Sequence, residues 1–379
     1  MALMSVWEKE SFFAPADIII AGSGLVGLWS AFYLKKKAPS LSITIVERGL
    51  IPTGASTRNA GFACFGSLTE IAAGVTEMGE DRLLQLVEMR FKGIKKIKKT
   101  FGNRAIGFEK NGGYELITAA DNNQLRSQID TFNHLLKKIT GQQKTFQLQN
   151  DLLPRFGFAG IQHLIANRSE AQLHSGKLCQ ALLHLVQSMG VTILNNTEIT
   201  AFEKVHGQLL LHTNHAFPLL SSQLLVATNA FARQLLPQLD IIPARGQVIV
   251  TSPIEGLPFK GCFHFDEGYY YFRDLGDRVL LGGARNKAFE EETTEEMILS
   301  DTIQQELERF LREVVLPGRQ YAIEHRWSGI MAMGSEKMPI LKAVNDQVFC
   351  AVRMSGMGVA LAPVIGEKVA ALMTDGLTV

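Results

Sequence analysis

The residues best suited to do chemistry in this sequence stand near its start, in a glycine-rich stretch at positions 17–27. Three glycines of this stretch have the spacing G-x-G-x-x-G. At this spacing Gly22 permits a tight turn, Gly24 lets the backbone approach a pyrophosphate, and Gly27 lets a helix pack closely on a strand. The unpaired N–H groups at the start of that helix favour negative charge. We therefore predict that a dinucleotide binds through Gly22, Gly24, Leu25, Val26 and Gly27.

Glu47 stands where such a site needs an acidic side chain. The motif follows an apolar strand and precedes a helix, and the next strand, 42–46, ends in Glu47. An acid at the end of this strand can accept hydrogen bonds from an adenosine ribose. Alone, the glycines could be a structural cluster and Glu47 a solvated surface carboxylate. Because both strands and the helix accompany them, they favour a dinucleotide site.

Size and composition are those of an ordinary soluble globular enzyme. The chain has 379 residues, of which 46% are hydrophobic and 20% charged, and its length favours two domains. The formal net charge of +1 gives no reason to expect nucleic acid as a partner. No apolar run approaches the ~20 residues that span a membrane, and the N-terminus lacks the apolar core of a secretion signal.

The cysteines, at positions 64, 179, 262 and 350, are widely spaced and form no C-x-x-C pair. This spacing argues against a disulfide framework and against a zinc site, so we expect no metal. Free thiols suit a reducing compartment, and we expect the protein to be cytoplasmic.

Further elements connect the first motif to a second glycine-rich loop near the end of the chain. Strands are expected at 269–273 and 278–285, with turns that indicate an antiparallel sheet, and a charged helix at 294–313. The last strand, 348–352, leads through the glycine-rich loop 354–359 into a final helix. Glycine-rich strand-to-helix turns at both ends of the chain are what a flavin, extended through a domain, requires.

With the loop Gly54-Ala55-Ser56-Thr57-Arg58-Asn59-Ala60-Gly61 between these ends, the sequence resembles the FAD-dependent D-amino acid oxidase superfamily. It looks most similar to the branch that holds glycine oxidase, sarcosine oxidase and γ-glutamylputrescine oxidase. Further motifs match in family order, at 227–230, 245–247, 326–329 with Pro339 beyond, and 356–363. Together the matches cover nearly the whole chain.

The resemblance implies an α/β fold with two interleaved domains. One would be a Rossmann-type FAD-binding domain assembled from residues 14–80, 165–243 and 325–379. The other, of α+β type, would be a substrate domain on a mixed or antiparallel sheet, built from residues 81–164 and 244–324.

The resemblance also implies which residues hold the cofactor. The three motif glycines would bind the pyrophosphate and Glu47 the ribose, while the backbone near Glu198 and Ile199 would lie by the adenine. Residues 58–62 would line the flavin, and residues 356–359 would offer N–H groups to its pyrimidine end. Beyond the five residues of the first loop, the expected set is Glu47, Arg48, Ala55, Ser56, Arg58, Asn59, Ala60, Gly61, Phe62, Glu198, Ile199, Thr228, Gly329, Gly356, Met357, Gly358 and Val359.

Two departures from the family pattern affect the prediction. Relatives with a covalent flavin attach it through a Cys near the tryptophan motif, and residues 327–333 contain none, so we expect non-covalent FAD. Amino-acid-oxidising relatives often read W-x-G-x-R-P, in which the Arg pairs with the substrate carboxylate. Here Met331 and Ala332 stand where Arg and Pro would fall. Either the substrate lacks an α-carboxylate, or Arg353 or Arg285 replaces that Arg; either arginine could instead simply face outward.

The remaining candidates for the substrate pocket are Arg58 and two tyrosines. Tyr269 and Tyr271 alternate on a predicted strand and would share a face, where they could form a substrate wall or ordinary sheet packing. Some relatives carry a Lys above the flavin that helps oxygen react, and the matching strand, 279–282, has none. The electron acceptor therefore stays open between O2 and a carrier protein.

Three functions remain in view. The first is FAD-dependent oxidation of the C–N bond of a small amine or amino acid, in which hydride passes to flavin N5 and the imine is hydrolysed. The second is an NAD(P)-dependent dehydrogenase with the same fingerprint, which the C-terminal loop argues against. The third is a flavin-binding protein without turnover.

Overall fold

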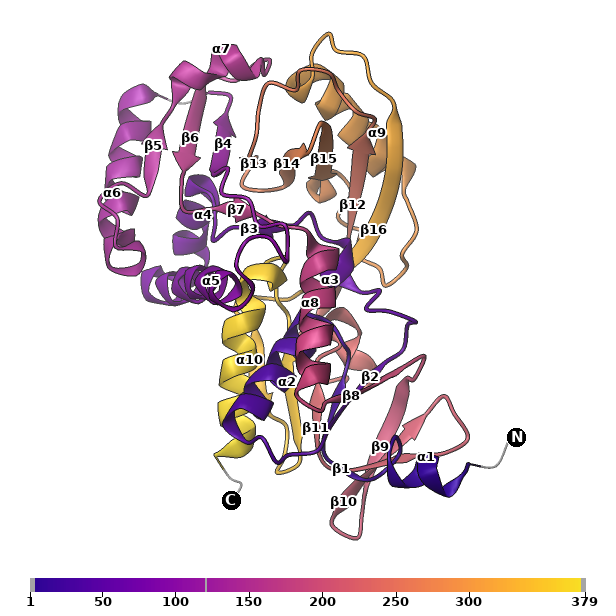
Figure 1. Cartoon of the computed structure of the whole chain (residues 1–379). Coiled ribbons are helices and arrows are strands. Elements are labelled where there is room, and N and C mark those ends of the chain that lie inside the picture. The colour runs from indigo at the N-terminus through magenta and orange to yellow at the C-terminus, as the bar shows by residue number, and fades with distance from the viewer. Residues whose placement is uncertain (1–3, 120, 376–379) are drawn as a thin grey trace. The chain divides into compact units, whose positions relative to one another are not determined.

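The computed structural model describes residues 4–119 and 121–375, which form two compact units (Figure 1). The first unit contains the described residues up to Thr57, Gly176–Pro243, and the described residues from Met331 onward. The second contains Ala244–Ile330 and the described residues of Arg58–Ser175.

Only the boundary after residue 243 coincides with a predicted domain boundary. Residues 58–80, 165–175 and 325–330 belong to the second unit instead of the first, because the strands they contain pair within it. The last four residues of the predicted FAD-binding domain, 376–379, lie outside the described residues.

The first unit is built on an eight-stranded sheet with a parallel centre. Its strand order is β17-β18-β11-β1-β2-β8, and β10 and β9 continue from β11 as an antiparallel pair. The pairs β18–β11, β11–β1, β1–β2 and β2–β8 are parallel, as a Rossmann-type sheet requires. The elements are α1 (Val6–Glu10), β1 (Ala16–Ala21), α2 (Leu25–Lys37), β2 (Ile43–Glu47), α3 (Ala55–Arg58), α8 (Ser175–Ser188), β8 (Thr192–Asn195), β9 (Ile199–Val205), β10 (Gln208–Thr213), β11 (Leu219–Val226), η2 (Asn229–Gln234), β17 (Ile340–Ala343), β18 (Val348–Val352) and α10 (Gly358–Thr374).

Helices α2 and α10 pack side by side in this unit (Figure 1). Both start directly after a glycine-containing turn, and both are apolar along most of their length, which suits burial against a parallel sheet. The two turns singled out in the sequence therefore both lead into buried helices.

The second unit is built on a mixed eight-stranded sheet in the order β16-β12-β15-β14-β13-β4-β6-β5. Its β13–β4 pair is parallel, so the sheet is not antiparallel throughout. The elements are β3 (Phe62–Ala63), α4 (Leu68–Met78), α5 (Glu80–Phe101), β4 (Gly113–Ile117), α6 (Asn122–Thr140), β5 (Phe146–Leu148), η1 (Asn150–Leu152), α7 (Leu153–Phe156), β6 (His163–Asn167), β7 (Ala171–Gln172), β12 (Ile242–Thr251), β13 (Cys262–Phe265), β14 (Tyr270–Leu275), β15 (Arg278–Gly283), η3 (Arg285–Lys287), α9 (Asp301–Phe310), η4 (Leu311–Val315) and β16 (Ile323–Met333).

One face of this sheet carries the apolar core, and the other combines a row of polar side chains with a small apolar cluster, Val248, Val250 and Leu280. On one face Phe263 stacks on Phe272, with ring centroids 4.7 Å apart, in a core cluster that α9 covers. On the other face the register places Glu115, His264 and Tyr271 side by side on adjacent strands. Because side chains alternate along each strand, Glu115, His264 and Tyr271 lie on the face opposite Phe263 and Phe272, which we call the polar face.

Two predicted elements differ from the structure. The charged helix begins at residue 301, where Ser300 accepts a hydrogen bond from the backbone N–H of Ile303 and so caps the first turn. Tyr269 precedes β14 and lies in a turn closed by its N–H to the carbonyl of Asp266, 2.8 Å away.

Candidate functional site

The glycine motif forms the predicted strand–turn–helix at the end of β1. A Cβ added to Gly27 would lie 2.0 Å from the carbonyl oxygen of Gly22, so the helix start and the turn touch through their backbones. Gly24 is the N-cap of α2 and supplies no capping side chain. The first turn of α2, which includes Leu25 and Val26, therefore offers backbone N–H groups and positive dipole to an anion.

Two hydroxyl groups of the first unit lie against this turn. Ser56, in α3 beside Ala55, accepts a hydrogen bond from the backbone N–H of Leu25 at 2.9 Å. Thr228 follows β11, and its methyl group is 3.5 Å from the position of a Cβ on Gly22. The hydroxyl of Thr228 is buried and has no hydrogen-bond partner among the described residues. A buried polar group without a partner is costly, which is consistent with a ligand that completes it.

Glu47 ends β2 beside the same loop and is buried. Its Oε2 accepts hydrogen bonds from the N–H and the hydroxyl of Ser23, at 3.1 and 2.9 Å, and its Oε1 accepts one from the N–H of Gly49 at 2.9 Å. These bonds fix the carboxylate at the end of the strand. Ionised oxygens have further acceptor sites, so Glu47 can still accept from a ribose.

Arg48, Glu198 and Ile199, which were predicted to bind the cofactor, lie close together in the first unit. A guanidinium nitrogen of Arg48 is 3.7 Å from a carboxylate oxygen of Glu198, and the guanidinium lies 3.9 Å from the ring centre of Phe231. Ile199 begins β9 directly after Glu198. The side chains of Arg48 and Glu198 are exposed and Ile199 is buried, and their role beside an adenine stays a prediction.

The C-terminal loop also ends in a helix start. Gly356 has a positive φ of 78°, and α10 begins at Gly358 with Met357 as its N-cap and no side-chain cap. Val359 is thus in the first helical turn, so the helix begins within the stretch 354–359 that was predicted as a loop. The hydroxyl of Ser355 is buried without a hydrogen-bond partner among the described residues.

Arg353 has a structural role in the first unit. Its guanidinium donates to Oδ2 of Asp240 at 2.5 Å, to Oε1 of Glu336 at 3.0 Å and to the carbonyl of Met338 at 3.0 Å. The side chain is 5% exposed. Because its donors already hold two carboxylates, we no longer favour Arg353 as a substrate ligand.

In the second unit, residues 58–62 are held by the tryptophan motif. Arg58 donates to the carbonyl of Ser328 at 2.9 Å, and the indole N–H of Trp327 donates to the carbonyl of Arg58 at 2.9 Å. Gly329 lies directly against the Arg58 side chain. Oδ1 of Asn59 accepts from the N–H of Gly61 at 2.8 Å, which closes a tight turn.

Arg273, which was not predicted from the sequence, stabilises this turn through hydrogen bonds to backbone carbonyls. Its Nη1 donates to the carbonyls of Leu173, Gly61 and Ala60, at 2.8, 3.2 and 3.4 Å. Gly61 must be glycine here, because its φ is +76° and a Cβ would lie 2.2 Å from the carbonyl oxygen of Leu173. Burial lowers the pKa of Arg273, yet the guanidinium stays a cation that supplies donors to three carbonyls.

Tyr271 and Tyr269 do not share a face, so that prediction is wrong. Tyr271 contacts Phe62 with ring centroids 5.9 Å apart, and burial raises the pKa of Tyr271 to about 12. Tyr269 packs against the aromatic core and contacts Phe289, because it lies in the turn before β14 where the strand alternation has not begun. Tyr271 is therefore the tyrosine that lies beside the predicted flavin-lining residues.

Arg285 remains a candidate cation in the second unit. It starts η3 after Ala284, which has a left-handed φ of 60°. Its guanidinium lies over Phe289, 4.7 Å from the ring centre, and has no ion pair among the described residues. Partial burial lowers its pKa, although an arginine stays charged. It is available to an anionic group.

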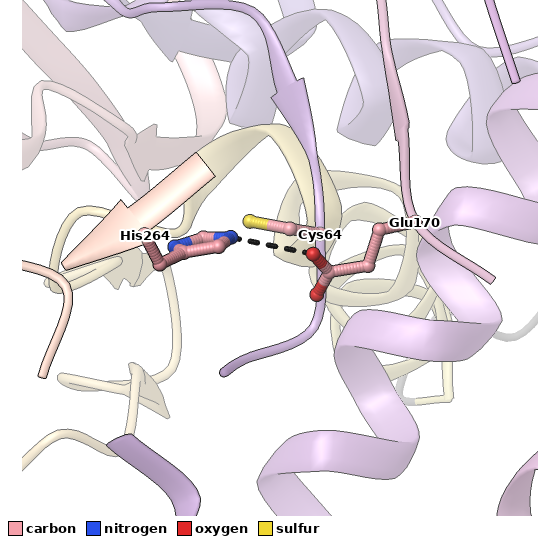
Figure 2. A group of neighbouring side chains, drawn as sticks. All are labelled: Cys64, Glu170 and His264. Atoms are coloured by element: carbon pink, nitrogen blue, oxygen red, sulfur yellow. Dashed lines mark hydrogen bonds and ion pairs between the residues drawn. The ribbon is translucent and has the colours of Figure 1, made fainter. Parts of the chain in front are cut away.

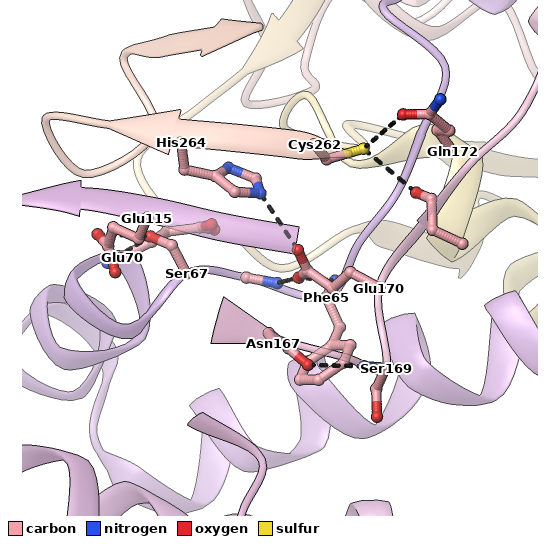
Figure 3. Close-up of polar contacts among 12 residues, drawn as sticks. Phe65, Ser67, Glu70, Glu115, Asn167, Ser169, Glu170, Gln172, Cys262 and His264 are labelled. Atoms are coloured by element: carbon pink, nitrogen blue, oxygen red, sulfur yellow. Dashed lines mark hydrogen bonds and ion pairs between the residues drawn. The ribbon is translucent and has the colours of Figure 1, made fainter. Parts of the chain in front are cut away.

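Cys64, Glu170 and His264 form a buried group that the sequence analysis missed (Figure 2). Their potential ligand atoms all lie within 4.8 Å of one another. Nε2 of His264 is 3.3 Å from Oε2 of Glu170, and Oε1 of Glu170 accepts from the N–H groups of Phe65 and Gly66 at 3.0 and 3.3 Å (Figure 3).

The residue types in this group would suit zinc. The contacts, however, are those of a hydrogen-bonded pair, His264 and Glu170, beside the thiol of Cys64. Both oxygens of Glu170 are in use, and one of them faces His264. Burial, followed by the charge of Glu170, raises the pKa of Cys64 well above its usual value, so the sulfur keeps its proton. We therefore assign no metal here.

Comparison with known proteins decides the family. The model of a family described as FAD dependent oxidoreductase matches residues 17–372, which includes both glycine-rich turns and all of the second unit. The chain belongs to this family. It is an FAD-dependent oxidoreductase, and the predicted superfamily and cofactor are confirmed.

Individual relatives of this oxidoreductase are distant. A probable oxidoreductase of Haemophilus influenzae, OrdL, is 22% identical over 372 residues, which cover 94% of this chain and 82% of that protein. The crystal structure of glycine oxidase from Geobacillus kaustophilus has a TM-score of 0.76 at 19% identity and covers 96% of each chain. That of L-proline dehydrogenase from P. horikoshii has a TM-score of 0.74 at 18% identity, over 96% of this chain and 94% of the other. At these identities the structures confirm the predicted fold class of the oxidoreductase.

No helix in the part of the oxidoreductase that the structure describes is both long enough and apolar enough to cross a membrane. All four cysteines are free and buried.

Proposed function

We propose that this oxidoreductase holds FAD non-covalently and oxidises the C–N bond of a small amine or amino acid. In this proposal the first unit is the FAD-binding domain and the second the substrate domain. The observation that carries it is a pair of helix starts in the first unit whose N-cap residues, Gly24 and Met357, supply no capping side chain. Each has a buried hydroxyl nearby, Thr228 and Ser355, without a hydrogen-bond partner among the described residues. Two such anion-favouring positions fit a long cofactor with negative charge at separate points.

The residues of the first unit would bind and position FAD. The first turn of α2 would bind the pyrophosphate, and Glu47 the ribose. When bound, FAD supplies a hydride acceptor at its N5 atom. The start of α10 would stabilise negative charge on the reduced ring, because a helix N-terminus favours anions.

The residues of the second unit would shape the substrate pocket. The turn at Asn59–Gly61 is fixed by Arg273, and Phe62 and Tyr271 form an aromatic wall beside it. Such a wall orients a small substrate and excludes water. Arg285 is the cation that could replace the Arg absent at Met331 if the substrate carries a carboxylate.

The proposal leaves the electron acceptor as O2 or a carrier protein. The NAD(P)-dependent alternative is not retained, since the family is FAD-dependent. Because all four thiols are free, we also propose a reducing, cytoplasmic location.

Acid precipitation of the purified protein tests the mode of cofactor binding. We expect the flavin to stay in the supernatant and to elute as FAD in chromatography, because no Cys is present near Trp327 to form a bond. A yellow pellet would contradict non-covalent binding. Release of ammonia or methylamine from a turned-over substrate would support C–N oxidation, whereas a flavin that no substrate reduces would favour a binding protein without turnover.

A further inference from the structure

His264 has one ring nitrogen held by a carboxylate and the other without a hydrogen bond. Its Nε2 lies 3.3 Å from Oε2 of Glu170, within hydrogen-bond distance (Figure 2). Its Nδ1 has no hydrogen-bond partner among the described residues. The side chains of His264 and Glu170 are 7% and 1% exposed. A buried imidazole with one unused nitrogen is available to a ligand that approaches from that side.

Glu170 determines which nitrogen carries the proton. It is fixed by two backbone N–H groups, from Phe65 and Gly66, at its other oxygen (Figure 3). Because a carboxylate oxygen accepts hydrogen bonds, we assign the proton of this contact to Nε2. In the neutral ring, Nδ1 then has the lone pair and is a proton acceptor. A carboxylate that orients a histidine in this way is a recurring arrangement for general bases.

The position of His264 in the sheet places it beside the proposed substrate pocket. It lies opposite Tyr271 across the β13–β14 pair, on the polar face. The ring of Phe62 is in contact with both, with centroids 5.3 Å from His264 and 5.9 Å from Tyr271. His264 is thus a titratable side chain in direct contact with the aromatic wall.

We propose that His264, oriented by Glu170, is the base that takes the proton from the substrate's ammonium group. This inference rests on the proposed function. An N–H bond of the ammonium breaks, its electron pair stays on the nitrogen, and a bond forms between that proton and Nδ1. The neutral amine can then lose hydride from its α-carbon, which an ammonium cannot do readily. The proton on His264 returns to solvent when the product leaves.

The charges around His264 favour this role. Those that face it are Glu170 beside β7, Glu115 on β4 and Glu70 on α4, with Arg90 on α5 paired to Glu70; the neutral titratable neighbours are Cys64, Cys262 and Tyr271. Burial lowers the pKa of His264, but the hydrogen bond to Glu170 and the three carboxylates outweigh burial and raise it above its ordinary value. A more basic histidine accepts an ammonium proton more readily, and the negative surroundings attract the ammonium itself.

The pH dependence of flavin reduction tests the proposal. The holoenzyme and its His264→Gln variant are mixed anaerobically with glycine, N-methylglycine, proline, putrescine and benzylamine between pH 6 and 10. Gln can still donate to Glu170 but cannot accept a proton, so we expect reduction of the variant to be slowed at pH 7 by about 10²- to 10⁴-fold. The deficit should shrink toward pH 10, near the ~10.4 of an alkylammonium group, because the substrate is then increasingly neutral. An equal deficit at every pH, or none, would overturn the inference.

Two further variants separate a base from a structural residue. Glu170→Gln should shift the acid limb of the wild-type profile to lower pH, since the carboxylate that raises the pKa of His264 is gone. The matched control is His212→Gln, which removes an exposed histidine that also pairs with a glutamate, Glu203, at 2.9 Å. We expect the control to keep the wild-type profile. A Glu170→Gln profile identical to that of wild type would count against the assigned orientation.

A measurement that does not depend on turnover checks the tautomer. In ¹⁵N-histidine-labelled holoenzyme, the resonance lost in His264→Gln should show a protonated Nε2 and a bare Nδ1 at alkaline pH. The opposite tautomer, or a stoichiometric transition metal in the purified protein, would overturn the proposal. If none of the five compounds reduces wild-type flavin, the proposed function fails as well. If wild type is reduced and His264→Gln keeps its pH profile, only this inference fails.

Discussion

Gly27 and Gly22 touch through their backbones, and a Cβ on Gly27 would lie 2.0 Å from the carbonyl oxygen of Gly22. Neither backbone can move without displacing β1 or α2. The contact explains why the motif needs its third glycine, and it ties cofactor binding to the local packing of the first unit.

Gly27→Ala should therefore lose FAD and stability together. Overpacking in a buried site typically costs about 1–3 kcal/mol, and backbone overlap stands at the upper end of that range. The measurements are flavin absorbance per protein and the free energy of unfolding in urea. Gly54→Ala is the control, because nothing lies within 4 Å of a Cβ there. Equal flavin content in both variants would contradict the contact's importance.

The parts of the site that sequence could predict are contiguous in the chain. Each of these parts belongs to a strand, a turn and a helix that follow one another in the chain: the turn at residues 22–27, Glu47 and the C-terminal loop. The spacing of the glycines indicates this succession directly. The prediction for Tyr269 was wrong because no feature of the sequence marks where the turn ends and β14 begins. One residue at a strand start decides which face a side chain takes.

The rest of the site depends on pairing between distant strands. Glu170 and His264 are 94 residues apart in sequence and meet because β13 pairs with β4 and β4 pairs with β6, which ends shortly before Glu170. No spacing rule in one sequence encodes those registers. Arg273 could have been found, since it stands two residues after Tyr271 on the same strand and so shares its face.

Arg285→Ala should weaken the binding of substrates that carry a carboxylate and leave the binding of simple amines unchanged. A charge-assisted hydrogen bond contributes about 1.5–3 kcal/mol, so KM for amino acids should rise roughly 10- to 150-fold. Arg353→Ala is the contrasting variant: because Arg353 is bound by Asp240 and Glu336, it should lower the melting temperature instead. An unchanged KM for amino acids in Arg285→Ala would exclude Arg285 as the carboxylate ligand.

Glu292→Ala should strongly destabilise the second unit. Glu292 accepts from Arg245 at 2.6 Å and from Gln247 at 2.9 Å, and the paired side chains are 0% and 3% exposed. Removing one partner of a buried ion pair leaves the other charge unpaired, at a cost of about 3–5 kcal/mol. Urea denaturation measures the loss. The exposed neighbour Glu291→Ala should be near neutral, and a similar effect in both would refute the buried pair's role.

The pair of His264 and Glu170 should make stability pH-dependent. The pKa of His264 is raised in the folded protein, so its contribution is fully present below the unfolded value of ~6.5 and is lost as pH rises through the folded value. The stability advantage of wild type over His264→Gln should therefore be larger at pH 6 than at pH 9. Denaturant titrations at both pH values check this, and an advantage that grows with pH would show that folding lowers the pKa of His264 instead of raising it.

Anaerobic titration of the purified protein with candidate substrates, followed by visible spectroscopy, is the decisive test of FAD-dependent amine oxidation. One set of compounds holds α-amino and N-methyl amino acids, and the other holds amines without an α-carboxylate. We expect the protein to show a flavin spectrum, and we expect at least one set of compounds to bleach it by reducing the flavin. Bleaching by the amines alone would mean that Met331 marks a change of substrate class, whereas bleaching by amino acids would point to Arg285. A colourless protein that cannot be reconstituted with FAD, or a flavin that neither set reduces, would contradict the account.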